Sequence, residues 1–348
     1  MPTSPSPGPD AAAGPSLVVQ QSFPEPRPTT NPYIVMLRDS LAATPGVQVR
    51  TFSWRSALLG RYDVFHAHWP EILVAGRNGP RAAVRQLLTV ALLTRLWLTR
   101  TPIVRTLHNL KRPEGISRRE DLILAWFEHR TALVILLNSS STAPPGVAGV
   151  IIPHGHYRGW FSAYAKPASV PGRLSYFGLV RRYKGVDTLL RAFRELSGDV
   201  SLRVAGKPSS PELARSLTEL AAGDDRIELT LRFLSDEELT AVAGEGELVV
   251  LPYREMHNSG GALTALSLGR PVLVPDNEVN RRLGAEVGPG WVFTYDGELT
   301  ADQLDATLRA LRSVDRVAEP DLSRREWDSA GRQHVDAYRR AVAARRHR

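Results

Sequence analysis

Short apolar segments alternate with helix-like segments along almost the whole chain, and this alternation constrains the fold more than any other feature. The apolar segments have the length and the β-branched and aromatic content of buried strands. We expect strands at residues 17–21, 47–53, 63–69, 102–109, 132–138, 149–154, 173–180, 200–207, 226–234, 248–253, 271–275 and 290–295. We expect helices to begin near Asn31, Pro80, Ser117, Lys184, Pro211, Ser235, Ser259, Asn277 and Thr300. This pattern predicts parallel sheets that helices cover on both faces.

One open sheet rarely takes so many strands, so the sequence predicts an α/β chain with two Rossmann-like, doubly wound domains and a deep cleft between them. The 348 residues are enough for two hydrophobic cores. We expect an N-terminal domain over residues 16–155 and a C-terminal domain over 156–320, which meet near the irregular, aromatic segment 154–173. Residues 1–15 indicate a disordered, proline-rich lead-in, and residues 321–348 form a separate C-terminal helical segment.

The chain has no cysteine and a formal net charge of +8, and both facts limit its chemistry. The absence of cysteine excludes disulfides, thiolate metal sites and cysteine nucleophiles, and it fits a reducing compartment such as the cytoplasm. The basic charge favours an anionic partner, whether nucleic acid, a phosphate-bearing substrate or anionic lipid. The aromatic residues do not interleave with the basic ones as stacking platforms would, so we expect no nucleic-acid partner.

Residues 81–105 form the most apolar stretch, but five arginines interrupt it. This pattern fits a helix that lies on a membrane surface, and it fits equally well a core helix with a solvated arginine face. We expect no signal peptide and no membrane span, because no basic leader with an apolar core and no uncharged apolar run of about 20 residues is present. The sequence therefore predicts a cytoplasmic protein that contacts the inner face of the membrane at most peripherally.

Two strand ends in the second half carry groups suited to bind an anion. After strand 173–180 comes the basic segment RRYKG, in which Arg181 and Lys184 follow Gly178 at the start of a helix. A glycine allows close approach of the backbone, and a helix start offers free N–H groups with partial positive charge. Arginine and lysine can then hold a diphosphate. The alternative is a solvated basic loop.

The second such strand end is the segment 251–275, LPYREMHNSGGALTALSLGRPVLVP. Asn258, Ser259 and Gly260 begin a helix after a strand, with Arg254 beside them. Ordinary N-capping by Asn258 or Ser259 is the alternative explanation. Two anion-binding helix starts on one sheet are what a nucleotide diphosphate needs, although no P-loop or dinucleotide fingerprint is present.

Histidines and a glutamate follow strands of the first half, in the segments HAHWPE (66–71), TLHNLKRPEG (106–115) and IPHGHY (152–157). An imidazole or the carboxylate of Glu71 can accept a proton from a substrate hydroxyl. For each histidine alone, a structural role is the alternative. His66 and His68 share one strand face, but no third ligand is evident, so we expect no metal site.

Several of these motifs resemble the GT-B glycosyltransferases. FGLVRRYKGVDTLLRAF is similar to the donor-site start of that superfamily, and LPYREMHNSGGALTALSLGRPVLVP is similar to its nucleotide-binding strand, loop and helix. NPYIVML, HAHWP, TLHNL and IPHGHY further resemble bacterial xanthan-type β-mannosyltransferases of polysaccharide assembly. The similarity runs from about residue 17 to 320. It implies that Gly178, Arg181 and Lys184 contact the donor diphosphate and that the C-terminal helix, with Trp327, crosses back to the first domain.

One departure from the superfamily bears on mechanism. Retaining members carry Glu-x₇-Glu in this region, but the matching positions here are Met256 and Thr264, and Glu255 lies one place from the first. Thr264 can still offer a hydroxyl to the ribose. The missing pair of glutamates favours an inverting enzyme, which needs a general base in the first domain.

The resemblance therefore implies an inverting glycosyltransferase that moves a hexose from a GDP- or UDP-sugar to a saccharide or polyprenyl-diphosphate-linked acceptor. We expect no metal or other cofactor, and we expect residues 81–105 to contact the membrane that holds the acceptor. The candidate general bases are Glu71 and His108, and the candidate substrate-binding residues are His68, His154 and Arg254. The alternatives are a nucleotide-sugar epimerase of the same fold and a non-catalytic module that binds sugar or nucleic acid.

Overall fold

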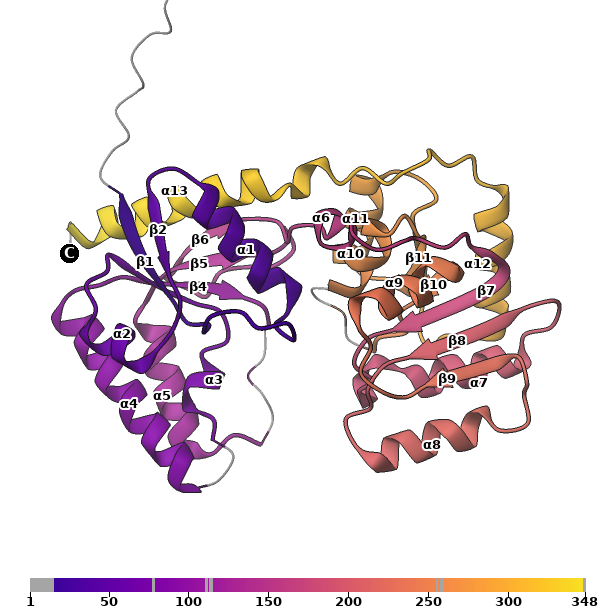
Figure 1. Cartoon of the computed structure of the whole chain (residues 1–348), viewed down its shortest axis with the longest axis horizontal. Coiled ribbons are helices and arrows are strands. Elements are labelled where there is room, and N and C mark those ends of the chain that lie inside the picture. Colours follow the sequence, from indigo (N-terminus) through magenta and orange to yellow (C-terminus); the bar gives the residue numbers. More distant parts are fainter. Residues whose placement is uncertain are drawn as a thin grey trace, which may run out of the picture. The chain divides into compact units, whose positions relative to one another are not determined.

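The structure is a computed structural model that describes residues 16–76, 79–109, 112, 115–254, 256 and 260–346, except the side chain of Arg346. It divides into two compact units (Figure 1). The first unit comprises the described residues up to Pro153 together with those from Trp327 onward, and the second comprises His154–Glu326. The last helix of the chain thus belongs to the unit that the chain builds first.

The first unit is built on a sheet of six parallel strands in the order β2-β1-β3-β4-β5-β6. The strands are β1 (Leu17–Gln21), β2 (Val47–Arg50), β3 (Val64–Ala67), β4 (Ile103–Leu107), β5 (Thr131–Leu136) and β6 (Ala148–Ile151). From β1 the chain first adds β2 on one side and then β3 on the other. The two strands that flank this change of direction, β1 and β3, define the switch point where ligands of such sheets bind.

Helices cover both faces of the first sheet (Figure 1). They are α1 (Pro32–Ala43), α2 (Trp54–Leu59), α3 (Glu71–Val74), α4 (Gly79–Leu98), α5 (Arg118–His129) and α13 (Trp327–Arg346). Helices α1 and α13 pack against each other on one face, and α4 packs with α2, α3 and α5 on the other. The alternation along β3 explains these two layers. Phe65 points into an apolar core with Leu92, Leu93 and Phe127, whereas His66 points to α13.

The second unit repeats this architecture with strands in the order β12-β11-β10-β7-β8-β9, all parallel. The strands are β7 (Val170–Phe177), β8 (Ser201–Ala205), β9 (Ile227–Thr230), β10 (Gly246–Val250), β11 (Val272–Pro275) and β12 (Val292–Tyr295). Here β7 and β10 flank the switch point, because the chain adds β8 and β9 on one side of β7 and then returns to add β10 on the other.

The helices of the second unit are α6 (Arg158–Phe161), α7 (Val186–Glu195), α8 (Pro211–Ala221), α9 (Asp236–Glu245), α10 (Gly260–Ser267), α11 (Glu278–Val287) and α12 (Ala301–Ser313). Short 3₁₀ turns occupy Arg182–Lys184 and Ser323–Arg325. Capping side chains explain several helix starts. Ser235 and Thr300 each form a capping box with the residue three places on, and Asn277 caps α11.

The predicted fold class is confirmed: each of the twelve expected strands is present, and the strands form two parallel α/β sheets. Helices also begin close to each expected start. The sequence did not predict α2, α3 and α6. Each has only one or two turns, which is too short for a helical apolar pattern to be visible. Among the described residues, no helix is long and apolar enough to cross a membrane.

A buried hydrogen-bond chain fastens α13 to the first sheet. The Tyr338 hydroxyl of α13 lies 2.8 Å from Nδ1 of His66, and Nε2 of His66 lies 2.8 Å from Oγ1 of Thr106 on β4. All three side chains are buried. Burial, followed by the neighbouring His334 and His108, holds the pKa of His66 well below its usual value. The ring is therefore neutral, with one nitrogen as donor and the other as acceptor, which suits two hydroxyl partners.

We expect Tyr338→Phe to destabilise the protein by about 1–3 kcal/mol, because it leaves a buried ring nitrogen of His66 without its partner while keeping the aromatic packing. The measurement is urea unfolding monitored by circular dichroism. Tyr183→Phe is the matched control, because that tyrosine is 50% exposed. Equal unfolding free energies for the two variants would contradict the structural importance of this hydrogen bond.

Candidate functional site

The residues that the sequence predicts to bind an anion lie at the switch point of the second sheet. Gly178 directly follows β7, and Tyr253 and Arg254 follow β10, the neighbouring strand. Because both strands run in parallel, their carboxyl ends meet at the same edge of the sheet. The structure therefore brings together the two loops that the sequence singled out separately.

Glycines let the backbone segments at this edge approach one another closely. Gly206, which follows β8, has a φ of +152°, and a Cβ there would lie 1.7 Å from the carbonyl oxygen of Gly178. Gly185 has a φ of +63°, and a Cβ there would lie 2.0 Å from the carbonyl oxygen of Pro252. No side chain fits at either position, so the loops after β7, β8 and β10 are held in contact through their backbones.

Lys184 lies at the centre of this edge. Its Nζ is 4.0 Å from the point where a Cβ of Gly178 would stand, and 4.8 Å from the centre of the Tyr253 ring. Burial, with the nearby Arg181 as a smaller cause, lowers the pKa of Lys184 to about 8. A half-buried ammonium without a carboxylate partner among the described residues favours an anionic ligand, because an anion would restore the charged form.

The two arginines of this edge differ in their surroundings. Arg181 is exposed. Arg254 forms an ion pair with Asp187 of α7 at 3.2 Å, and its backbone N–H donates to the carbonyl oxygen of Tyr183. The Arg254 side chain therefore joins the loop after β10 to the start of α7, and Arg181 is the more available cation for a ligand.

Helix α10 begins at Gly260 in the same loop region, and Asn258 and Ser259 lie outside the described residues. A Cβ at Gly260 would lie 3.4 Å from the Tyr157 hydroxyl, so that hydroxyl lies beside the helix start. Thr264 lies one turn further and is 8% exposed. Its predicted contact with a ribose stays a prediction.

His154 belongs to the second unit and lies near α10. Its Nδ1 lies 2.8 Å from the carbonyl oxygen of Gly155, and its Nε2 lies 3.4 Å from the Tyr157 hydroxyl. Burial lowers the pKa of His154 to about 4. A buried imidazole with partners on both nitrogens orients neighbouring groups and is poorly placed to take a proton from a substrate.

The first unit brings His68 and His108 together at its own switch point. His68 directly follows β3 and His108 directly follows β4, and Nδ1 of His68 lies 3.1 Å from Nε2 of His108. On its other side, Nε2 of His68 lies 3.2 Å from Oε1 of Gln21, the last residue of β1. The three strand ends therefore contribute one residue each to a continuous polar chain.

Electrostatics and packing fix the arrangement of these rings. Burial, with the neighbouring His66 as a smaller cause, holds the pKa of His68 well below its usual value, so this ring stays neutral. The Trp69 indole stacks on His108 at 4.0 Å between ring centres, and Tyr33 meets His108 edge-on at 5.2 Å. Among Gln21, His68 and His108, only His108 is half-buried, so it is the one that a substrate can reach.

Glu71, in the first turn of α3, lines a cavity that His68, Trp69 and His108 also line. The cavity has a volume of about 10 Å³, which is enough for one water molecule. Burial is the main cause that raises the pKa of Glu71; Arg105 opposes this and Glu128 adds to it. The two candidate bases from the sequence therefore lie in one site.

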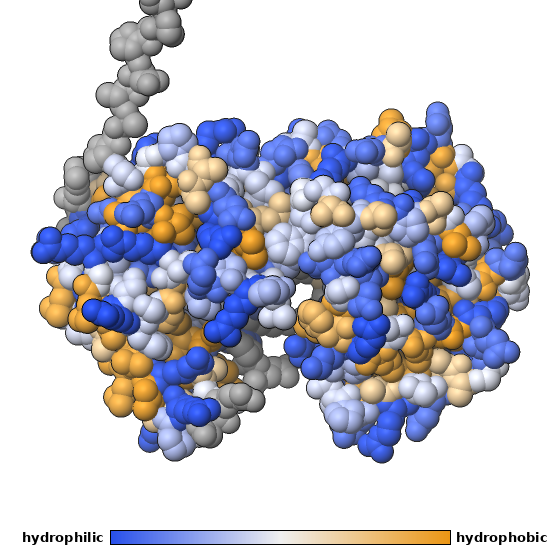
Figure 2. Space-filling model, viewed as in Figure 1, coloured by the Kyte–Doolittle hydropathy of each residue, from blue (hydrophilic) through white to orange (hydrophobic). Residues whose placement is uncertain are grey.

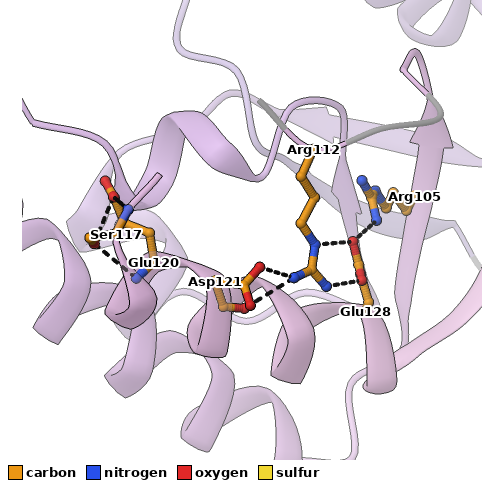
Figure 3. Close-up of polar contacts among 6 residues, drawn as sticks. All are labelled: Arg105, Arg112, Ser117, Glu120, Asp121 and Glu128. Carbon is orange, nitrogen blue, oxygen red and sulfur yellow. Dashed lines mark hydrogen bonds and ion pairs between the residues drawn. The ribbon is translucent and has the colours of Figure 1, made fainter. Parts of the chain in front are cut away.

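A network of ion pairs supports this cavity from α5. Figure 3 shows the Arg112 guanidinium between Asp121 and Glu128, with Arg105 on the other side of Glu128. Arg105 lies 3.1 Å from Glu128. No local sequence pattern predicts this network, because its members come from β4, α5 and the loop between them.

Within the described ranges, no group of three or more His, Asp or Glu side chains is arranged to hold a metal ion. Both nitrogens of His66 face hydroxyl groups instead. Sequence reasoning also missed Gln21, Tyr157 and Tyr253, which complete the polar and aromatic surroundings of the predicted residues. Gln21 and Tyr253 stand at strand ends, so the topology itself was the available signal.

Comparisons with known proteins identify the family. The chain matches the family model described as glycosyl transferases group 1 over residues 171–311. It is 44% identical over 334 residues to the GDP-mannose:glycolipid 4-beta-D-mannosyltransferase of Xanthomonas campestris pv. campestris, an alignment that covers 95% of each protein. The chain belongs to the group 1 glycosyltransferases. The resemblance to bacterial β-mannosyltransferases is thereby confirmed.

Solved structures of other enzymes share the fold. Sucrose-phosphate synthase from Thermosynechococcus elongatus matches with a TM-score of 0.61 at 14% identity, covering 94% of this chain and 100% of that one. A putative UDP-N-acetylglucosamine 2-epimerase from Listeria monocytogenes matches with a TM-score of 0.52 at 13% identity, covering 93% and 96%. The fold alone thus suits a transferase or an epimerase. The sequence identity to a mannosyltransferase decides between them, and this glycosyltransferase is an enzyme of the GT-B fold.

Proposed function

We propose that this glycosyltransferase moves a mannosyl group from GDP-mannose to a hydroxyl of a glycolipid and forms a β-linkage. The observation that carries the proposal is the 44% identity to a GDP-mannose:glycolipid 4-beta-D-mannosyltransferase across 95% of both proteins. The sugar of GDP-mannose is α-linked, so a β-product requires inversion at its C1. This agrees with the absence of the two glutamates that retaining members of the superfamily carry.

In this proposal, the second unit binds the donor at its switch point. Lys184 and Arg181 face the diphosphate, Gly178 lets it approach the backbone, and the start of α10 adds N–H groups. These cationic and N–H groups stabilise the charge that develops on the departing GDP, so no metal or other cofactor is required for the leaving group. Asn258 and Ser259 stay candidates for the same diphosphate or the nucleotide.

We assign the general base to His108. If Nε2–H of His68 donates to Oε1 of Gln21, then Nδ1 of His68 accepts from Nε2–H of His108. The proton-accepting nitrogen of His108 is then Nδ1. After it takes a proton, His108 still donates to a neutral His68, which stabilises the imidazolium. His68 is thus a positioning residue.

The reaction is one displacement at C1 of the mannose. The acceptor oxygen forms a bond to C1, while its proton passes to Nδ1 of His108. The bond between C1 and the phosphate oxygen breaks, and its electron pair leaves with GDP. Glu71 lines the same cavity as His108 and can hold an acceptor hydroxyl by accepting a hydrogen bond.

The first unit also offers a surface for the membrane that holds a glycolipid. Helix α4 buries Leu92, Leu93 and Leu96 in the core, yet Leu87 on its outer side is 70% exposed. Figure 2 shows apolar side chains gathered over α2 and α4, with hydrophilic ones among them. An exposed apolar face beside arginines is typical of a helix at a lipid surface. We propose that α4 contacts the inner face of the membrane.

The test of the donor assignment is a comparison of GDP-mannose, UDP-glucose and dTDP-glucose by thermal shift and by transfer to membrane-extracted glycolipid. We expect only GDP-mannose to raise the unfolding temperature markedly and only GDP-mannose to label the glycolipid, with β-configuration by NMR. Selective binding and transfer with a UDP-sugar would overturn the donor assignment. Turnover of donor without acceptor would restore the epimerase alternative.

We expect His108→Ala to lower kcat by a factor of about 10²–10⁴ with little change in donor affinity, because it removes the proton acceptor. Glu71→Gln should mainly raise the KM for the acceptor, because a neutral amide oxygen accepts a weaker hydrogen bond from the acceptor hydroxyl than a carboxylate does. The measurement is steady-state transfer at several pH values. The reverse pattern, with kcat lost in Glu71→Gln and retained in His108→Ala, would move the base to Glu71.

We expect GDP affinity to fall as pH rises above about 8, because free Lys184 loses its charge through a pKa of about 8 and a neutral amine no longer attracts the diphosphate. The loss should approach about tenfold per pH unit while the complex keeps the proton. Calorimetric titration with GDP between pH 7 and pH 9 measures it. Lys184→Met should bind weakly with a flattened pH dependence, whereas Lys166→Met, at an exposed site, should behave as the unaltered protein. If GDP affinity fell with pH as steeply in Lys184→Met as in the unaltered protein, Lys184 would not be the titrating group.

A further inference from the structure

A large cavity opens at the amino-terminal edge of the first sheet, opposite to the edge that carries His108. Its volume is about 430 Å³. The end of α4, the residues before β4, the turn between α5 and β5, and the end of α13 line it. No residue of the donor or base sites takes part, so the proposed transfer chemistry leaves this cavity unexplained.

The lining of this cavity is strongly basic. Arg100, Arg130, Arg345 and His129 line it, and no Asp or Glu does. Arg345 donates to the carbonyl oxygen of Thr99 at 2.9 Å. Neither Arg100 nor Arg130 forms an ion pair with any residue that the structure describes. Guanidinium groups that line one cavity without carboxylates repel one another, and a bound anion would relieve that repulsion.

The backbone at Arg100 supports a specific role for its side chain. Helix α4 ends with N–H of Thr101 bonded to the carbonyl oxygen of Leu96 and N–H of Arg100 bonded to that of Trp97. In such a helix end, the residue with positive φ is usually glycine. Arg100 occupies this position with a φ of 51°, and it is the one non-glycine residue with positive φ in the described chain. Arg100 therefore places its side chain at the rim of the cavity at the cost of backbone strain.

Apolar side chains adjoin the basic lining. Trp97 and Leu98 line the cavity and are 55% and 69% exposed. They lie at the end of α4, the helix whose outer side also exposes Val84 and Leu87. A ligand that fits this arrangement has an anionic group for the arginines and an apolar part for the tryptophan and leucine.

We propose that this cavity binds the phosphate group of an anionic phospholipid, with Arg100, Arg130 and Arg345 around the phosphate and Trp97 beside the acyl chains. The inference rests on the membrane contact proposed for α4 and gives it a lipid preference. Binding here fixes which side of the first unit faces the bilayer, and it leaves the carboxyl edge of the sheet to the acceptor.

The test is co-sedimentation of the full chain with vesicles, without donor or acceptor. One set of vesicles is phosphatidylcholine, and the other is an equimolar mixture of phosphatidylcholine and phosphatidylglycerol. We expect the protein to prefer the anionic vesicles. Arg100→Gly should weaken binding to them about fivefold, the effect of one arginine near a charged surface. Its unfolding temperature should stay equal or rise, because glycine suits the positive φ, so misfolding cannot explain the loss.

Matched variants separate this site from general effects of charge and apolarity. Arg340→Ala removes the same charge from an exposed position of α13 outside the cavity and should change binding little. Leu87→Ser should lower binding to both vesicle types without changing the preference. An equal loss in Arg340→Ala and Arg100→Gly, or unchanged binding in Arg100→Gly, would overturn the proposal.

A soluble anion is the other source of the same chemistry. Glycerol 1-phosphate should not compete with anionic vesicles at millimolar concentration, since it lacks the acyl chains that Trp97 and Leu98 would contact. Effective competition by it would overturn the lipid assignment in favour of a soluble phosphate. Because no sugar transfer is measured, failure of the donor proposal would leave the vesicle result unaffected. Loss of lipid preference would likewise leave GDP-mannose binding intact.

Discussion

The hydrogen bond between Tyr338 and His66 connects the last helix of the chain to a central strand of the first sheet. His66 in turn contacts Thr106. His68, which lies two residues after His66 and directly follows β3, contacts His108 and Gln21. The buried rings are neutral because burial lowers the pKa of each. The half-buried His108 therefore contacts an uncharged His68 whose two ring nitrogens both have hydrogen-bond partners, which is a rigid support for the proposed proton acceptor.

The same topological fact places the working residues of both units. A doubly wound sheet leaves a gap in its helical cover where the chain changes direction, and the residues at the carboxyl ends of the flanking strands face that gap. In the first unit these ends carry Gln21 and His68, and in the second they carry Gly178 and Tyr253. In the proposed mechanism, the first unit presents an imidazole for proton transfer, and the second presents cations and glycine-rich backbone for a diphosphate.

Much of this organisation was predictable from the sequence, because strand segments, glycines and capping residues are local signals. The residues that follow the predicted strands also indicate Glu71, His108 and Lys184 as candidates. The partners that give these residues their chemistry were not predictable. Tyr338 lies 272 positions from His66, and the pairing of Arg254 with Asp187 joins the loop after β10 to the first turn of α7. Such contacts depend on packing between distant elements, which local pattern does not encode. The short helices α2, α3 and α6 were not predicted because they have too few residues to show a helical apolar period.

The position of α13 has a consequence for how the protein is made. The first unit includes the final residues of the chain, and the second unit is inserted between its parts. During synthesis the second unit can fold before α13 has left the ribosome, and until then the first unit lacks one of its helices. The unit that carries the proposed base is therefore completed after the second unit. A prematurely terminated chain can retain the second unit but lacks the helix whose Tyr338 bonds to His66.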